Sequence, residues 1–244
     1  MTATVVLVAL DGPENAHHAM PVAKRFADLR GGALAVSAEN SGVAILAAAA
    51  DHGAGLIVMS AHSADAPPAG AIGEAALAVL CGAHCPVVLV GPAQAPDDWA
   101  LGKVLAPHDG SPTVSDGLRP ATELARAAGA ELIVLQVACD TRAQETGSIG
   151  SPLYLDQIQH GWPAWSREFL HRLSCICPLA DVRVRLLVGH GAPANETVRV
   201  AKEEPADLIV LAWKGCWDAG RASTLKAVLR DAPCPVMVTR VLGS

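Results

Sequence analysis

The feature that most constrains this chain is an internal repeat whose period is a whole domain. Three pairs of segments match, in the same order in both halves. They are "VVLVALDG" (5–12) with "KVLAPHDG" (103–110), "LIVMSAH" (56–62) with "LIVLAWK" (208–214), and "AHCPVVLV" (83–90) with "APCPVMVT" (232–239). The chain is therefore predicted to contain two copies of one unit.

The two copies differ in length. The offset between matching positions is 98 residues at the first pair, 152 at the second and 149 at the third. The second copy thus holds 54 additional residues before its "LIV" strand, and the loop after that strand is three residues shorter. In the same interval the first copy has only the strand-like "ALAVS" (33–37) and a helix at 41–52, so we expect it to lack one strand and one helix.

The apolar segments predict strands that alternate with helices. They are continuous runs rather than alternating patterns, which is typical of buried parallel strands. Predicted strands of the second copy are 103–107, 131–138, 182–188, 207–212 and 235–240. Predicted helices are one that begins at Ser111 and Pro112 and stops at Gly129, and others at 163–174, 193–203 and 223–230. This order implies an α/β fold with doubly wound parallel sheets and right-handed crossovers.

The repeat divides the chain into two domains. The first covers 1–95 and is shortened, and the second covers 100–244 and carries an insertion at about 141–180. The segment between them, "GPAQAPDDWALG" (91–102), is rich in Pro, Gly and Asp, so an exposed linker is predicted.

Composition excludes several classes of function. The net charge of −6 comes without a Lys/Arg cluster, which disfavours nucleic-acid binding. No apolar run reaches the roughly 18–20 residues of a membrane-spanning helix, and the N-terminus has no basic flank or cleavage site, so we expect a cytoplasmic protein. The seven cysteines fall mostly in apolar segments, as at Cys85, Cys139 and Cys234, and are expected to be reduced rather than disulfide-bonded.

Several segments point to one known family. In the second copy these are "APHDG" (106–110), "ADLIVLAWKG" (206–215) and "VLRDAPCPVMV" (228–238), and in the first copy, more weakly, "GAGLIVMSAHS" (53–63) and "AVLCGAHCPVVLV" (78–90). In these residues the chain resembles the universal stress protein family in its tandem, two-domain form. The resemblance implies two flavodoxin-like (adenine nucleotide alpha hydrolase-like) sandwiches that pair through their fifth strands. The chain would then form its own pseudo-dimer, and a homodimer stays open.

The resemblance also implies a site in the second copy. Many members of the family bind ATP through a Gly-x2-Gly-x9-Gly-Ser/Thr loop, an Asp after the first strand, and the end of the second strand as a wall for the base. Carried over, these positions are Asp109, Gly110, Ser111, Val137, Ala212, Gly215, Ala222 and Ser223. Only six residues separate Gly215 from Ala222, which is too short for the usual path around three phosphates. The nearby Lys214, Arg221 and Lys226 would offset anionic charge.

The same loop in the first copy is predicted to be vestigial. Ser60 and Ser63 stand at the glycine positions, while the nine-residue spacing and Gly73 are retained. Glu74 stands at the hydroxyl position, where its carboxylate would repel a phosphate. Asp11 remains at the end of the first strand, so only part of a nucleotide site is left.

Other candidates each have more than one interpretation. Asp109 and Asp11 suit either a ligand or a turn before a helix, and His108 suits either the ligand crevice or a surface loop. In the insertion, Tyr154, His160, Trp162, Trp165 and Phe169 would form a lid, a contact surface, or packing for a long crossover. The spacing of His171, Cys175 and Cys177 has no second ligand pair, so core packing is favoured over a metal site.

No catalytic motif accompanies this fold: the sequence has no nucleophile elbow, Walker loop, dinucleotide glycine motif or zinc-protease helix. We therefore expect a non-enzymatic stress-response regulator that binds ATP or AMP in the second domain only, with a protein partner that the sequence does not identify. The alternative is a nucleotide-free interaction protein that uses the aromatic insertion and the pseudo-dimer surface. A third interpretation, an ATP-cleaving enzyme, is disfavoured because no pyrophosphatase-type loop follows either first strand.

Overall fold

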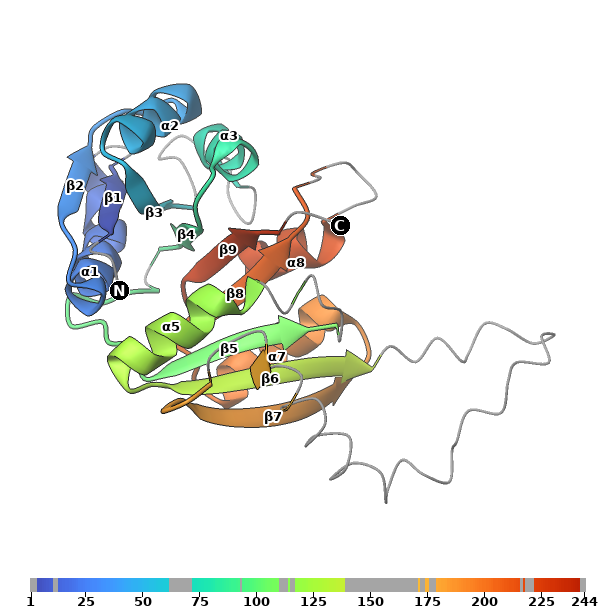
Figure 1. Ribbon diagram of the computed structural model, residues 1–244. Coiled ribbons are helices and arrows are strands. Elements are labelled where there is room, and N and C mark those ends of the chain that lie inside the picture. The colour runs from blue at the N-terminus through green and yellow to red at the C-terminus, as the bar shows by residue number, and fades with distance from the viewer. Residues whose placement is uncertain are drawn as a thin grey trace, which may run out of the picture.

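A computed structural model gives the fold of the chain (Figure 1). It describes residues 4–10, 13–61, 72–92, 94–109, 114, 117–138, 171, 174–175, 179–215, 217 and 222–241. The predicted helix at 163–174 and the aromatic insertion lie almost entirely outside these residues.

One continuous sheet of nine strands runs through both halves of the molecule, in the order β2-β1-β3-β4-β9-β8-β5-β6-β7. The strands are β1 (Val5–Ala9), β2 (Leu34–Ser37), β3 (Ala54–Ser60), β4 (Val87–Val90), β5 (Lys103–His108), β6 (Glu131–Ala138), β7 (Arg183–His190), β8 (Leu208–Trp213) and β9 (Val236–Arg240). All neighbouring pairs are parallel except β4 and β9, which run antiparallel where the two halves meet. The predicted tandem α/β fold and the pairing of the two units through their last strands are confirmed.

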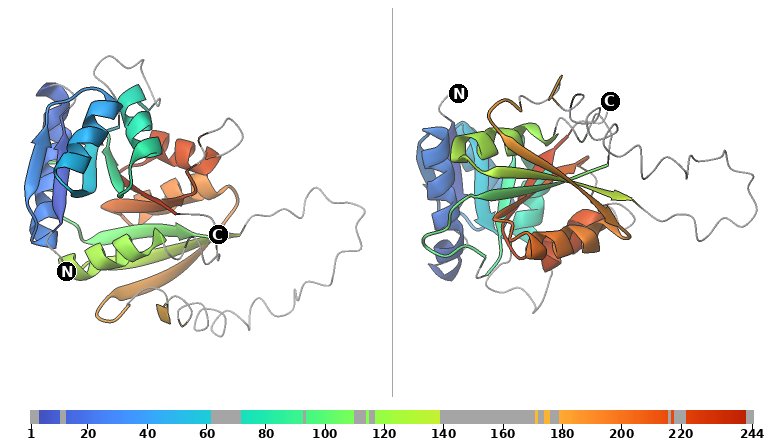
Figure 2. Two further views of the ribbon diagram at one scale, coloured as in Figure 1. Left: turned by 45° about the horizontal axis from the view of Figure 1, so that its top comes forward. Right: turned by 90° about the horizontal axis from the view of Figure 1, so that it is seen from below.

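Helices cover both faces of the sheet (Figures 1 and 2). They are α1 (Pro13–Arg30), α2 (Gly42–Asp51), α3 (Glu74–Gly82), α5 (Arg119–Ala128), α7 (Pro193–Glu203) and α8 (Ser223–Asp231). The first helix of each half, α1 or α5, packs on one face through residues such as Phe26 and Leu124. The later helices pack on the other face through residues such as Ile45, Val79 and Val228. Successive residues of a strand point to opposite faces, so both faces of these apolar strands are buried.

Most predicted boundaries agree closely with the structure. The helix at 193–203 is confirmed residue for residue as α7, where Pro193 occupies the first turn that suits proline. The strand at 131–138 is likewise confirmed as β6. The helix predicted from Ser111 does end before Gly129, but α5 begins at Arg119, and Ser111 and Pro112 lie outside the described residues.

The shortening of the first half falls at the edge of the sheet. In the second half β7 is the outermost strand and shields β6, whereas the described part of the first half has no counterpart to β7. Strand β2 is therefore the edge, and Val36 in it is 51% exposed. The missing strand that the offsets predict is confirmed; the matching crossover helix of the second half lies outside the described residues.

The segment between the halves is only in part the exposed linker that its composition predicted: Pro92, Pro96, Asp97 and Asp98 are exposed, but other residues are not. Its Ala95, Trp99 and Leu101 are buried, and the Trp99 ring meets the Phe26 ring of α1 edge-on at 5.5 Å. Gln94 fixes the start of the segment: its Oε1 accepts from the Gly91 N–H over 2.7 Å, and its Nε2 donates to the Ala232 carbonyl over 2.8 Å. The prediction missed the buried residues because Pro and Asp indicate turns rather than exposure, and the apolar residues between the turns reach the core.

Trp99→Ala should destabilise the protein by about 3 kcal/mol, because it removes a large buried side chain and leaves a cavity beside Phe26. Chemical denaturation followed by circular dichroism would measure the change. The exposed neighbour Asp98 provides the control, since Asp98→Ala should change stability by less than about 0.5 kcal/mol. Equal effects of the two substitutions would contradict a structural role for the segment.

Candidate functional site

The candidate site lies where the second half of the sheet changes direction. Strand β5 is flanked by β6 on one side and by β8 on the other, so the chain winds outward both ways from β5. In open α/β sheets such a switch point leaves a crevice at the carboxyl ends of the strands. Asp109 follows β5 directly and stands at this position.

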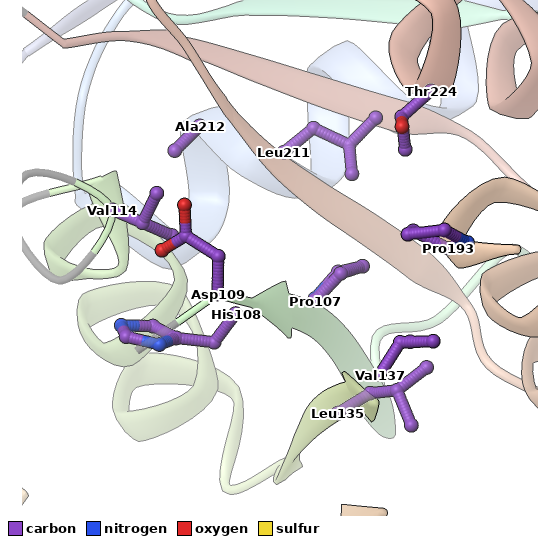
Figure 3. A pocket seen from close by; sticks show the side chains of 10 residues that line it. All are labelled: Pro107, His108, Asp109, Val114, Leu135, Val137, Pro193, Leu211, Ala212 and Thr224. Atoms are coloured by element: carbon purple, nitrogen blue, oxygen red, sulfur yellow. The ribbon is translucent and has the colours of Figure 1, made fainter. Parts of the chain in front are cut away.

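A cavity of about 250 Å³ opens at this switch point (Figure 3). Its walls are mainly apolar, from residues of β5, β6, β8 and the start of α7. The lining residues are Pro107, His108, Asp109, Val114, Leu135, Val137, Pro193, Leu211, Ala212 and Thr224. The Asp109 carboxylate points toward Ala212 and Val114 in Figure 3, so one charged group faces an otherwise largely apolar space.

A second cavity, of about 490 Å³, adjoins the first and extends over the beginning of α8. The two cavities share Asp109, Val114, Ala212 and Thr224. The second is also lined by Trp213, Lys214, Ala222, Leu225 and Val241. Together they form a site with an apolar part between β6, β8 and α7 and a part near the first turn of α8 that contains a cation.

His108 is a wall residue rather than a surface residue, since only 4% of it is exposed. Along β5, Leu105 belongs to the core on the α7 side and Ala106 to the core on the α5 side. By this alternation Pro107 faces the first cavity, and the His108 ring lies away from Leu135 and Val137 (Figure 3). Burial lowers the pKa of His108, and the nearby Asp109 carboxylate partly opposes this effect. The surface-loop interpretation of His108 is wrong.

The first turn of α8 borders the second cavity, which Ala222, Thr224 and Leu225 line. The helix begins after Ala222, whose φ of 59° lies in the left-handed region and whose side chain cannot cap the helix. The first hydrogen bond of the helix runs from the Lys226 N–H to the Ala222 carbonyl over 2.9 Å. The preceding N–H groups, including that of Thr224, therefore have no acceptor within the helix, and such groups favour an anion.

The two lysines near this turn have different surroundings. Lys214 lines the second cavity. Lys226 instead donates from Nζ to the Trp217 carbonyl over 3.1 Å, and the same nitrogen lies 4.9 Å from the centre of the Trp217 ring. Trp217 in turn meets the buried Trp213 edge-on at 6.0 Å. Lys214 is thus the better placed of the two for a ligand, and Arg221 lies outside the described residues.

Gly215 has a structural role that its sequence position did not reveal. Its φ is +82°, a conformation that other residues adopt rarely, and a Cβ there would lie 2.8 Å from Arg240 Nε. Arg240 crosses this glycine and donates from Nη1 to the Cys81 carbonyl at the end of α3, over 3.1 Å. Gly215 lines neither cavity and instead lets Arg240 connect the two halves.

The structure brings four predicted site residues together: Asp109, Val137, Ala212 and Ala222 line the cavities. Ser223 is the first residue of α8 and lines neither cavity, and Gly110 and Ser111 lie outside the described residues. The site residues inferred from the family resemblance did not include Pro193 and Thr224, which line the first cavity. A proline that opens a helix straight after a strand end was a usable signal for Pro193, since such ends border the crevice.

The helix that follows the corresponding loop of the first half begins differently. Ser60 is buried at the end of β3, and Gly73 precedes α3 and donates its N–H to the Ala61 carbonyl over 3.0 Å. Glu74 occupies the first turn of α3, where its carboxylate favours the helix dipole. Ser63 and Asp11 lie outside the described residues. The end of α3 that would hold a phosphate thus carries a negative charge of its own.

Comparisons with known proteins agree with this architecture. The model of the universal stress protein family matches residues 101–240. A universal stress protein of Methanocaldococcus jannaschii is 26% identical over 146 residues, which are 57% of this chain and 81% of the relative. The solved structure of a universal stress protein from Archaeoglobus fulgidus aligns over 98% of this chain and 96% of its own, with a TM-score of 0.64 at 15% identity.

A putative universal stress protein from Pseudomonas aeruginosa gives a similar result. It covers 98% of this chain and 83% of its own, with a TM-score of 0.61 at 19% identity. At such identities the likeness of the two structures is one of fold, and it extends over both halves of the chain. No helix within the described ranges is long and apolar enough to cross a membrane.

Lowering the pH from about 7.5 to about 5.5 should destabilise the protein through His108. Because burial lowers the pKa of His108, the unfolded chain takes up a proton near its ordinary pKa of about 6.5 while the folded chain does not. The free energy of unfolding therefore decreases as the pH is lowered, by at most about 1.4 kcal/mol per pH unit for one group. Chemical denaturation of the wild type and of His108→Gln, at several pH values between about 5.5 and about 7.5, would measure this change in the free energy of unfolding.

His108→Gln should show a flatter dependence of stability on pH than the wild type. His84 is exposed, so His84→Gln serves as the matched control and should keep the slope of the wild type. A slope that is the same in all three proteins would contradict a buried, neutral His108.

Proposed function

The chain belongs to the universal stress protein family, and from this premise we propose that it is a non-enzymatic stress-response regulator that binds an adenine nucleotide in its second half. The observation that carries the proposal is the cavity at the switch point of β5, with Asp109 at its mouth. Ligand sites of this kind combine apolar walls with a few polar groups that fix orientation.

The first cavity suits a base and its ribose. Leu135, Val137 and Pro193 supply apolar surface against which a flat aromatic base would lie. A carboxylate accepts hydrogen bonds from hydroxyl and amino groups, so Asp109 would bind the ribose or the base amino group. The volume of about 250 Å³ is near the lower end for ligand sites, which favours one base and sugar in this cavity.

The second cavity suits the phosphate end of the same ligand. It adjoins the first through Asp109 and Thr224, so a ligand can extend from one to the other. Lys214 lines it, and the first-turn amides of α8 favour negative charge. The Asp109 carboxylate faces both cavities, so phosphates are expected near Lys214 and α8, away from Asp109. AMP fits this chemistry, and ATP would need another path for its phosphates than the usual one of the family, because only six residues separate Gly215 from Ala222.

We assign nucleotide binding to the second half only. Glu74 places a carboxylate in the first turn of α3, the position that corresponds to the phosphate-binding turn of α8. The Glu74 carboxylate would repel a phosphate at this turn, and the partial positive charge of the turn's amides cannot offset the full negative charge of that carboxylate. A phosphate would therefore bind to α8 in preference to α3.

We propose a regulator rather than an enzyme because no catalytic motif of the sequence falls at the two cavities. Their polar and charged residues are His108, Asp109, Lys214, Thr224 and Trp213. The His108 ring lies on the α5 side of β5, away from Leu135 and Val137 where the base would lie (Figure 3). The proposed output is binding that changes the surface offered to a protein partner.

Native mass spectrometry of freshly purified protein should detect a co-purified adenine nucleotide, and calorimetric titration should give binding of ATP or AMP. Asp109→Ala should weaken this binding by about tenfold or more, because a hydrogen-bonded charged group contributes about 1.5–3 kcal/mol. Asp97 is exposed in the segment between the halves and outside both cavities, so Asp97→Ala should bind like the wild type.

Absence of binding at millimolar ATP and AMP, with a folded protein, would contradict the proposal and favour the nucleotide-free interaction protein. Release of phosphate from ATP above the level of a no-protein control would contradict the non-enzymatic part. Equal loss in Asp109→Ala and Asp97→Ala would place the ligand elsewhere on the chain.

A further inference from the structure

Thr224 is a polar residue on the inward-facing stripe of α8. The other residues of this stripe, Leu225, Val228 and Leu229, are buried in the core. Thr224 is half-buried and lies four residues before Val228, so it stands on the same side of the helix, one turn nearer the start. Positions on such a stripe are normally apolar, and a polar residue there is informative.

The internal repeat shows that packing does not require a hydroxyl at this position. Strand β4 matches β9 at an offset of 149 residues, and α3 matches α8 at the same offset. Thr224 therefore corresponds to Ala75, which packs against the core near the start of α3. The inward stripe of α3 is apolar from Ala75 onward, whereas that of α8 begins with a hydroxyl group.

The Thr224 hydroxyl makes no hydrogen bond to any of the residues that the structure describes. Two other threonines in helices donate to the carbonyl four residues earlier: Thr122 to Leu118 over 3.0 Å, and Thr197 to Pro193 over 2.7 Å. Thr224 is the second residue of α8, so the helix itself offers no carbonyl at that spacing. Its hydroxyl is therefore available to a ligand.

Thr224 lines both cavities of the site. Ser223, the residue at the hydroxyl position of the family motif, is exposed and lines neither. Successive residues of a helix point about 100° apart, so the two side chains face different surroundings. Figure 3 shows Thr224 across the first cavity from Asp109, with Leu211 between them. A phosphate beside Thr224 would thus stay away from the Asp109 carboxylate.

We infer that Thr224, and not Ser223, supplies the hydroxyl that binds the phosphate nearest the ribose. The inference rests on the proposed function, because it concerns the ligand of that same site. A base against Leu135 and Val137 directs the ribose and first phosphate toward the second cavity, which Lys214 lines. Thr224 borders both cavities, so its hydroxyl and its N–H can donate to this phosphate while Lys214 offsets the negative charge.

The start of α8 accounts for the change of residue. Only six residues separate Gly215 from Ala222, against nine in the family motif, and Ala222 turns the chain into the helix with a φ of 59°. With this start Ser223 faces solvent, and Thr224 takes the inward position. The phosphate-binding hydroxyl is thereby moved one residue along the helix.

Thr224→Val removes the hydroxyl and nearly keeps the shape of the side chain, so it should weaken AMP binding about tenfold or more. Adenosine has no phosphate, and its affinity should change by less than about twofold. Thr224→Ser keeps the hydroxyl and should bind AMP nearly as the wild type does, and so should Ser223→Ala. Calorimetric titration of the full chain with AMP and with adenosine would measure these affinities.

Equal AMP binding by Thr224→Val and the wild type would overturn the inference and leave the proposed nucleotide site standing. A loss in Ser223→Ala as large as that in Thr224→Val would do the same. Equal losses of AMP and adenosine in Thr224→Val would also overturn it, because the hydroxyl would then contact the base or the ribose. A folded wild type that binds neither ligand would overturn the proposed function and this inference with it. Unfolding midpoints would check that every variant is folded.

Discussion

The antiparallel pairing of β4 and β9 is the contact on which the rest of the molecule depends. Val87, Val88 and Leu89 lie opposite Val238, Met237 and Val236, so a four-residue strand joins the two halves through backbone hydrogen bonds and buried side chains. Because the pairing is antiparallel, it relates the halves by a pseudo-two-fold axis and puts corresponding helices on the same face. The buried segment around Trp99 and the bond from Arg240 to Cys81 both cross this joint.

The joint also explains how an incomplete half can persist. A four-stranded unit with an open edge at β2 buries less apolar surface than its five-stranded counterpart, and small units are hard to stabilise alone. Here its last strand is a central strand of a larger sheet, and its core is continuous with that of the second half. The core shared with the second half supplies the stability that a fifth strand would otherwise give. At the start of α3 this half has Glu74, where the second half has Ser223 at the start of α8.

Much of the fold could be predicted because its signals are local. Strand β6 and helix α7 follow from apolar runs and from a proline at a helix start, each readable within about ten residues. The burial of Trp99 could not be predicted, since it depends on Phe26 in another element. At the site, Asp109 and Ala212 follow from their place at strand ends. The role of Gly215 does not, because it depends on Arg240, which crosses this glycine and donates to the Cys81 carbonyl of the other half.

The repeat separates what the fold requires from what it does not. At several matched buried positions the residues stay apolar: Ala49 pairs with Ala201, and Val79 and Leu80 pair with Val228 and Leu229. Packing demands this in both halves, so these positions say nothing about function. Exposed positions face no such demand, and charge there favours solubility. The charges of Arg199, Lys202 and Arg230 on α7 and α8 are replaced by Ala47, Ala50 and Cys81 on α2 and α3, at exposed positions where the packing of the fold requires neither kind of residue.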